Sequence, residues 1–349
     1  MEGIVKISFG LIVLNGYPFI TYNLKSIYPF AHEIIVVEGA CPSASNVATF
    51  DGHSIDGTLQ LLYDFKKNHD PQNKIIIVKA VDKGYENGFW PEKDQMSQAY
   101  AERASGNYLW QIDCDEFYRK DDMEKIINLL KEGVDAISFP TITFWGSIRY
   151  CVSGFRLISD NARRFDRLFA WGNGYTYKTH RPPTVIDENG IDTKKKRYVS
   201  SDEMEVMGIY LYHYSLVYPL HVGYKMNYYA TKVNYKYSEW YKNNYLIITN
   251  PFRVHNEFEY ISWLEKYDCV HPEYVEVMNN DIENRVIIME TRYMFDAQKL
   301  VDNNLYYITT HIFKQLAYAL KYKPLNYFRT LYFKVRNQVL LVIRTKFIR

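Results

Sequence analysis

The sequence of residues 108–118 is YLWQIDCDEFY, an apolar segment that runs directly into three acidic residues, Asp113, Asp115 and Glu116. The apolar part, 108–112, has the length and composition of a buried strand. An extended backbone places side chains two positions apart on the same side of the chain, so Asp113 and Asp115 point one way and the residue between them points the other. The stretch therefore predicts a strand that delivers two carboxylates to one place.

Two structural interpretations compete with a functional one for these carboxylates. They could lie in an acidic surface loop, or they could cap a helix, although Asp121 and Asp122 are better placed to cap the helix that follows. Two like charges side by side are costly unless a positive charge joins them. Mg²⁺ and Mn²⁺ prefer oxygen ligands, and Mg²⁺ usually combines one or two carboxylates with substrate phosphates. The pair therefore indicates a divalent metal site that serves a phosphorylated substrate.

Apolar segments alternate with amphipathic ones before this stretch. The segments predicted to be strands are 4–14, 33–39 and 74–80, and those predicted to be helices are 19–28, 59–67 and 91–106. This alternation is typical of βαβ units, which form a parallel sheet with helices on both sides. Ligands of such sheets bind beyond the carboxyl ends of the strands, where Asn15, Glu38 and Asp113 all lie.

The pattern changes after residue 131. Residues 134–146 are predicted to form a pair of strands, and strand-like alternation returns at 209–219. The polar and charged segment 187–205 is predicted to be a flexible loop, and the chain is predicted to be helical from Phe252 onward.

These segments define the expected architecture. We expect an α/β fold with a mostly parallel sheet flanked by helices in residues 1–245, and a helical C-terminal extension in residues 246–349.

Composition narrows the classes of function. The 349 residues carry a net charge of +2, so no overall field favours nucleic acid as a partner. The four cysteines are scattered without CxxC spacing, which fits a reducing compartment. No signal peptide and no run of ~18 apolar residues is found, so we expect a cytoplasmic protein. The 33 tyrosines reflect either a compositional bias or rings that bind sugar.

Four motifs in order carry a resemblance to a known family. They are VLNGYPFI (13–20), EIIVVEG (33–39), DGHSIDGT (51–58) and WPEKDQMSQAYAERASGNYLWQIDCDEFY (90–118). This series resembles the nucleotide-binding half of family-2-like glycosyltransferases with the GT-A fold. The resemblance covers roughly residues 5–120 and continues more loosely through 166–171, 179–183 and 211–215.

The series also departs from the family pattern. Gly16 replaces an acidic residue, Glu38 stands where Asp is usual, and the segment 40–50 looks inserted. These departures leave the nucleotide base open, as uracil or guanine.

The resemblance implies a role for each polar residue near the strand ends. Asp113 and Asp115 would hold Mn²⁺ or Mg²⁺ under the donor diphosphate, with His213 as a third ligand or else as an ordinary core histidine. Lys93 and Arg181 would face the phosphates or the sugar, although Lys93 is equally typical of a helix surface.

The resemblance also implies which residues contact the nucleoside and which residue acts on the acceptor. Asn15, Glu38 and Asp56 would meet the nucleoside. An inverting transfer also needs a general base near the acceptor hydroxyl. Asp166 is favoured over the other acidic candidates, and an ion pair with a neighbouring arginine is its structural alternative. The other candidates are Asp160, Asp187 and Glu188.

The C-terminal segment carries nine basic residues and no acidic residue after Asp302. An anionic membrane surface suits such a basic amphipathic segment, and docking on its own domain or on a second subunit is the alternative.

The sequence thus predicts a metal-dependent, inverting glycosyltransferase. It would move a hexosyl or N-acetylhexosaminyl group from a UDP- or GDP-linked sugar to a glycan or lipid-linked acceptor on the inner membrane face. A catalytically inactive sugar- or nucleotide-binding relative is the first alternative. A nucleotidyltransferase is the second, but residues 8–18 lack the Gly-rich basic loop that this class would need.

Overall fold

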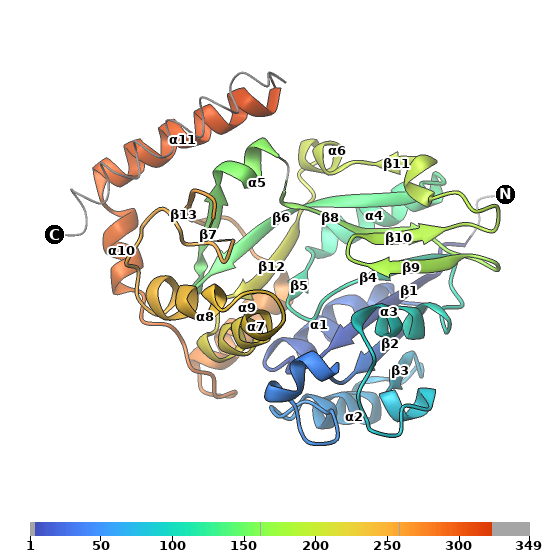
Figure 1. The fold of residues 1–349 in the computed structure, drawn as a ribbon. Coiled ribbons are helices and arrows are strands. Elements are labelled where there is room, and N and C mark those ends of the chain that lie inside the picture. The colour runs from blue at the N-terminus through green and yellow to red at the C-terminus, as the bar shows by residue number, and fades with distance from the viewer. Residues whose placement is uncertain (1–3, 161, 258, 323–349) are drawn as a thin grey trace.

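The computed structural model describes residues 4–160, 162–257 and 259–322 (Figure 1). Eleven strands of this part form one sheet. They are β1 (Ile7–Val13), β2 (Glu33–Glu38), β3 (Ile75–Val78), β4 (Tyr108–Gln111), β5 (Glu116–Phe117), β6 (Ala136–Trp145), β7 (Ser147–Gly154), β8 (Arg164–Ala170), β11 (Tyr198–Val199), β12 (Leu211–Leu216) and β13 (Ser262–Lys266). A separate hairpin consists of β9 (Thr176–His180) and β10 (Pro183–Ile186).

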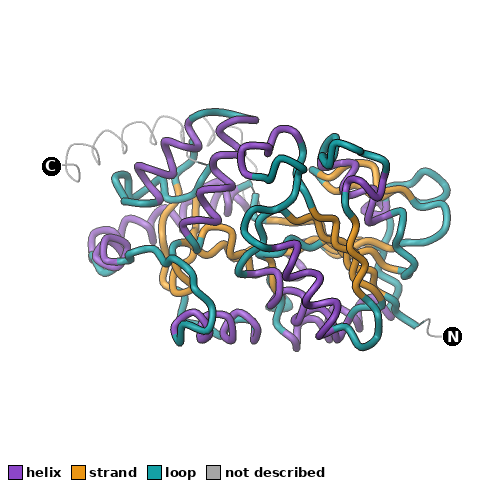
Figure 2. The backbone as a smooth tube through the Cα atoms, turned by 90° about the horizontal axis from the view of Figure 1, so that it is seen from below, coloured by secondary structure: helices purple, strands orange, loops and turns teal. Residues whose placement is uncertain are grey.

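Helices lie on both sides of the strands (Figure 2). They are α1 (Phe19–Ile27), α2 (Thr58–His69), α3 (Lys93–Ala101), α4 (Lys120–Lys131), α5 (Phe155–Ser159), α6 (Ser201–Val206), α7 (Pro219–Lys232), α8 (Lys236–Trp240), α9 (Glu273–Glu283), α10 (Phe295–Val301) and α11 (Asn304–Tyr322). Shorter 3₁₀ turns span Tyr28–Phe30, Pro42–Val47, Ala80–Lys83 and Thr193–Lys195, and a π-helical turn spans Tyr241–Tyr245.

The N-terminal half of the sheet is parallel, in the order β3-β2-β1-β4. Strands β1, β2 and β4 are mostly apolar and buried on both faces, as expected for a parallel sheet covered by helices, and the edge strand β3 is half-buried. The α/β class predicted from the sequence is therefore confirmed, and the strands and helices predicted up to residue 112 are all present.

Helices pack closely on both faces of these strands. On one face, Phe9 and Leu11 of β1 share a core with Phe65 of α2. On the other face, Gly10 lies against the ring of Tyr100 on α3, and a Cβ added to Gly10 would come within 2.4 Å of that ring. The absence of a side chain at Gly10 therefore sets how closely α3 approaches the sheet.

Beyond β4 the sheet becomes mixed. Strand β8 pairs antiparallel with both β4 and β6, β7 pairs antiparallel with β6 and β13, and β12 runs parallel to β6. Because β13 lies after residue 245, the sheet continues into the predicted C-terminal region, where α9, α10 and α11 then follow.

Three local predictions differ from the structure. The chain is already helical in α7, well before Phe252, and β13 interrupts the region predicted to be helical. The predicted loop 187–205 contains β11 and also α6, which begins with a capping box between Ser200 and Glu203.

The other differences are smaller. The segment 134–146 forms the single strand β6, whose partner β7 follows it. Arg119 occupies the N-cap position of α4, and Asp121 and Asp122 lie in the first turn, where the helix dipole favours acidic residues.

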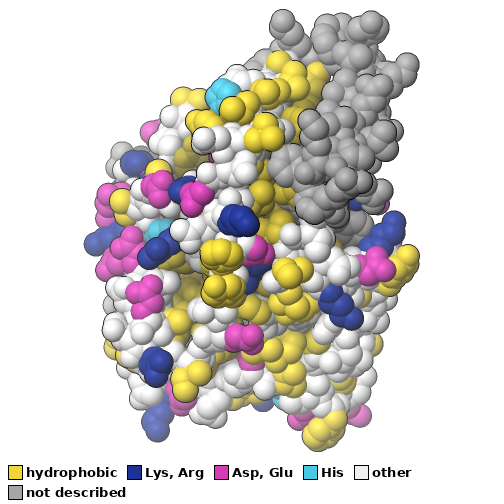
Figure 3. Space-filling model, turned by 90° about the vertical axis from the view of Figure 1, so that its left-hand side faces the viewer, with side chains coloured by type: hydrophobic (Ala, Val, Ile, Leu, Met, Phe, Trp, Pro, Cys, Tyr) yellow, Lys and Arg dark blue, Asp and Glu magenta, His cyan; other side chains and the backbone are white. Residues whose placement is uncertain are grey.

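Most of the basic C-terminal segment, from residue 323 onward, lies outside the described residues. Two of its lysines belong to α11, where Lys314 pairs with Glu265 at 2.9 Å and Lys321 pairs with Asp202 at 2.7 Å. Hydrophobic side chains gather near the top of the face in Figure 3, where α11 lies. No helix in residues 4–160, 162–257 or 259–322 is long and apolar enough to cross a membrane.

Candidate active site

A cavity of about 470 Å³ lies beyond the carboxyl ends of β1 and β4. One wall comes from the segments that follow β1, β2 and β4, together with the start of α3. The opposite wall comes from β8, the turn of the β9–β10 hairpin, β12 and α7, and residues 255–257 close one side. A cavity at this edge of a parallel sheet is where ligands of such folds bind.

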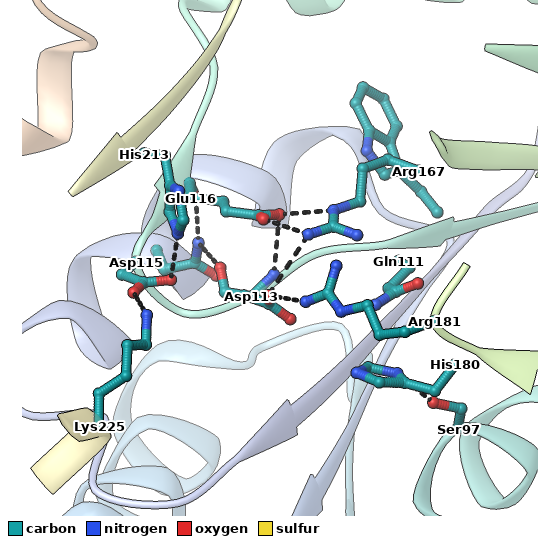
Figure 4. Close-up of polar contacts among 12 residues, drawn as sticks. Ser97, Gln111, Asp113, Asp115, Glu116, Arg167, His180, Arg181, His213 and Lys225 are labelled. Atoms are coloured by element: carbon teal, nitrogen blue, oxygen red, sulfur yellow. Dashed lines mark hydrogen bonds and ion pairs between the residues drawn. The ribbon is translucent and has the colours of Figure 1, made fainter. Parts of the chain in front are cut away.

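Asp113 lies at the centre of a partly buried network of charges (Figure 4). The Asp113 Oδ2 atom is 3.0 Å from Arg181 Nη2 and 3.4 Å from Arg167 Nη2. Arg167 is fully buried, its Nε donates to Glu116 Oε2 at 2.9 Å, and its Nη2 bonds the other oxygen of Glu116. Burial alone would raise the pKa of Asp113, but Arg167 and Arg181 hold it well below its ordinary value.

Asp115 has its own positive partner. Its carboxylate is only 4% exposed, and Lys225 Nζ of α7 lies 3.1 Å from its Oδ2 atom. The Nε2 atom of His213 lies 3.7 Å from the other oxygen. Burial opposes ionisation, but Lys225 outweighs it and lowers the pKa of Asp115 to about 2. Burial lowers the pKa of His213 to about 3, so this imidazole is neutral at pH 7.

The structure does not arrange the three predicted metal ligands to bind a divalent ion. These residues are Asp113, Asp115 and His213. Cations of the chain already contact one oxygen of each carboxylate, with Lys225 on Asp115 Oδ2 and two arginines on Asp113 Oδ2. Within the described part of the chain, no group of three or more His, Cys, Asp or Glu side chains is arranged to hold a metal. The sequence correctly places His213 beside Asp115, and its role as a ligand stays a prediction.

The β9–β10 hairpin brings His180 and Arg181 to the cavity. The backbone N–H of His180 donates to Asp94 Oδ1 at 2.8 Å, and its Nδ1 lies 2.8 Å from the hydroxyl of Ser97. Burial lowers the pKa of His180 to about 3. The neutral imidazole thus holds the hairpin against α3, and Arg181 is left at the cavity surface.

Asn15 and Glu38, two of the residues predicted to contact a nucleoside, organise the segment between β2 and α2. The Asn15 amide donates to the Val47 carbonyl at 2.7 Å and accepts from the Ile55 N–H at 2.9 Å. The buried carboxylate of Glu38 accepts from the Ser54 N–H at 2.8 Å. Asn15 lines the cavity, whereas Glu38 lies behind the wall.

Of Asp56 and Lys93, likewise, only one lines the cavity. The Asp56 carboxylate accepts from the backbone N–H groups of Thr58 and Tyr17 at 3.0 and 2.9 Å, and it does not line the cavity. The ammonium of Lys93 lies in the cavity wall, 4.5 Å from the centre of the Tyr228 ring. Of these two, the structure brings only Lys93 to the site.

Asp166, the predicted general base, does not line the cavity. Side chains alternate along β8, so Phe165 lines the cavity, Arg167 points to Asp113 and Glu116 behind it, and Asp166 faces away. The Asp166 carboxylate lies 3.1 Å from Lys194 Nζ, so the ion pair considered as its alternative is present, although with a lysine. This position does not fit catalysis by Asp166.

The other acidic candidates also lie outside the cavity wall, namely Asp160, Asp187 and Glu188. Among the described lining residues the acidic side chains are Asp113, Asp115 and Glu257. Glu257 is 45% exposed, and its Oε2 atom lies 3.6 Å from Arg156.

The sequence interpretation missed the contribution of α7. His221, Lys225 and Tyr228 of this helix all line the cavity. Their spacing of four and then three residues places them on one helical face, and this periodicity is the signal that would have found them.

The sequence matches no protein family and no curated protein. Among solved structures, the chain is similar to S. aureus TarS 1–349, with a TM-score of 0.38 and 14% identity over 70% of this chain and 75% of that chain. The same fragment in complex with UDP-GlcNAc gives a TM-score of 0.37 and 14% identity, with 66% of this chain and 67% of that chain covered.

A third similar structure is glucosyl-3-phosphoglycerate synthase from Mycobacterium tuberculosis in complex with Mn²⁺, UDP and phosphoglyceric acid. Its TM-score is 0.28 and its identity 19%, with 40% of this chain and 43% of that chain covered. The likeness to all three structures is distant. The function is therefore inferred from the geometry of the cavity.

Proposed function

We propose that the protein transfers a sugar from a nucleoside diphosphate sugar to a hydroxyl group of an acceptor. The carrying observation is that Lys93, Arg181 and Lys225 all line one cavity at the carboxyl ends of the parallel strands. Diphosphates bind best to guanidinium and ammonium groups held in such a concave site. The distant structural neighbours with bound UDP or UDP-GlcNAc are in accord with this ligand class.

The two sides of the cavity would bind different parts of the donor. Arg181 and Lys225 stabilise the negative charge that develops on the leaving diphosphate, which is the principal requirement of the reaction. The segment that Asn15 holds in place forms the wall against the nucleoside. No step is assigned to a metal ion, because the carboxylates already have cationic partners.

The acceptor side needs a base that faces the cavity. We assign this role to Glu257, because its carboxylate lines the cavity and makes no contact with Lys93, Arg181 or Lys225. The acceptor is proposed to be a glycan or a lipid-linked saccharide, as the sequence resemblance implies. Tyr228, Tyr229 and Tyr237 line the same cavity, and aromatic side chains of this kind can pack against a saccharide.

Release of nucleoside diphosphate from a panel of UDP- and GDP-sugars tests the proposal. Intact protein should release one nucleotide, and Asp115→Ala should lower the rate by about 100-fold, because it removes the partner that positions Lys225. Asp64→Ala, at an exposed position on α2, serves as the matched control and should keep the full rate.

Two outcomes would contradict the proposal. Tight nucleotide binding without turnover, with every acceptor tried, would identify a catalytically inactive binding protein of the same fold. Failure of a correctly folded protein to bind any nucleoside diphosphate would exclude both interpretations.

A further inference from the structure

Lys225 lies where a divalent cation would neutralise Asp115. We infer that Lys225 takes the place that a divalent metal ion would occupy next to Asp115. The protein would then bind the donor diphosphate with the Lys225 ammonium group and without a divalent cation. This inference rests on the proposed function.

The position of Lys225 is fixed by packing. Helix α7 buries Val222 and Met226 in a core on one side of Lys225. On the other side, the backbone carbonyl of Asp115 accepts from the Tyr214 N–H at 2.8 Å, which holds the turn after β4 against β12. The contact of 3.1 Å between Lys225 and Asp115 therefore joins two groups whose backbones are both anchored.

The carboxylates around Lys225 already have cationic partners from the chain. The three carboxylates are Asp113, Asp115 and Glu116, and the three cations in contact with them are Arg167, Arg181 and Lys225. A divalent ion that bound the remaining oxygens of Asp113 and Asp115 would be repelled by Lys225 and also by Arg181. Both effects oppose its binding, because like charges at short range repel strongly in a buried site.

Lys225 also has donors to offer to a phosphate. A lysine ammonium carries three N–H donors and no acceptor, and the contact with Asp115 uses one of them. The side chain is 27% exposed and lines the cavity together with Arg181 and Lys93. A diphosphate in the cavity would thus meet a cation that Asp115 already orients, which is the electrostatic task that a bound metal ion performs elsewhere.

Binding of UDP and GDP, measured by calorimetry in EDTA and then in Mn²⁺, tests this inference. Wild-type protein should bind one of them equally well in both buffers. Lys225→Met should weaken binding in EDTA by at least about tenfold, the loss of one charge-assisted contact. Lys225→Arg, which keeps the charge, should retain binding in EDTA. Lys236→Met, at an exposed position on α8, should behave as wild type.

A second measurement uses Mn²⁺ alone, followed by electron paramagnetic resonance. Wild-type protein should leave Mn²⁺ free in solution. Lys225→Met should bind it, because this substitution releases the Asp115 carboxylate. Thermal unfolding of each variant checks that it is folded, and Lys225→Arg gives a second test of the charge if Lys225→Met is unstable.

The outcomes separate this inference from the proposed function. Nucleotide binding by the wild type only when Mn²⁺ is present would overturn the role of Lys225 and leave the transfer reaction standing. Absence of nucleotide binding in either buffer would overturn the transfer reaction. The Mn²⁺ measurement still tests the role of Lys225 in that case, because tight Mn²⁺ binding by the wild type would show that Lys225 does not replace a metal ion.

Discussion

The wall of the cavity that follows β4 and the wall that faces it differ in charge and in origin. The first presents carboxylates, Asp113 and Asp115, from one short turn. The second presents the cations Arg181 and Lys225 from a hairpin and a helix, and the buried Arg167 of β8 lies behind it. Each carboxylate thus meets a partner that is distant in sequence, and the site exists only when both halves of the sheet have folded together.

Arg167→Met should break this arrangement most severely. The substitution leaves Glu116 buried without its partner, and the loss of one member of a buried ion pair costs about 3–5 kcal/mol. Urea unfolding should show a decrease of this size in the free energy of unfolding. Arg164→Met, at an exposed position on the same strand, should cost little. A loss under about 1 kcal/mol in Arg167→Met would show that the two halves do not depend on this contact.

Glu257→Gln tests whether the third side of the cavity supplies the base. Loss of a general base typically lowers the rate by about 10²–10⁴-fold, and donor binding should be unchanged because Glu257 does not contact Lys93, Arg181 or Lys225. Steady-state rates and calorimetry measure the two effects separately. Glu259→Gln, an exposed neighbour, is the matched control. An unchanged rate in Glu257→Gln would remove this residue from the mechanism.

Arg181→Gln should have a smaller effect, because its side chain is half exposed. Loss of one charge-assisted contact to the diphosphate should weaken donor binding by about tenfold. Titration with the donor nucleotide measures this change, with Arg149→Gln, an exposed position on β7, as control. Unaltered binding would place the diphosphate elsewhere in the cavity.

The smallest expected effect concerns pH. Burial holds the pKa of His180 at about 3, below the value near 6.5 of an unfolded histidine, so the unfolded chain binds more protons between these values. His180 therefore lowers stability as pH falls through this window, by up to about 1.4 kcal/mol per pH unit.

Urea unfolding at pH 7 and pH 5 tests this effect. The decrease in stability between the two values should be smaller in His180→Gln than in the wild type, whereas the exposed His69→Gln should change nothing. An equal decrease in wild type and His180→Gln would mean that folding does not shift the pKa of His180.

The two walls also differ in how far the sequence predicts them. Strands β1 to β4 are short, apolar and regularly spaced, so their pattern predicts the position of Asn15 and Asp113 at the strand ends. Lys225 contacts Asp115 across 110 positions, and no local pattern records such a pairing. Helix α7 was missed because the segment PLHVGYKMNYYATK is rich in aromatic residues that also favour strands.

The orientation of β8 was equally hard to predict. Its sequence RFDRLFA places a charged residue on each face, so composition does not tell which of Asp166 and Arg167 is buried. The pairing with β6 also contains a register shift between Ile137 and Ser138. Tertiary contacts determine which side chain is buried, because Arg167 contacts Glu116 and Asp113 only after β4 and β8 have paired.

The contact between Asp115 and Lys225 limits which substitutions can be accepted at these two positions during evolution. A change at either position alone leaves a buried charge without its counterpart, and selection acts against it. Changes at both positions together preserve neutrality. Descendants of this chain should therefore keep both residues or exchange both, and a lineage that has lost the lysine but kept the aspartate would be one that has come to depend on a metal.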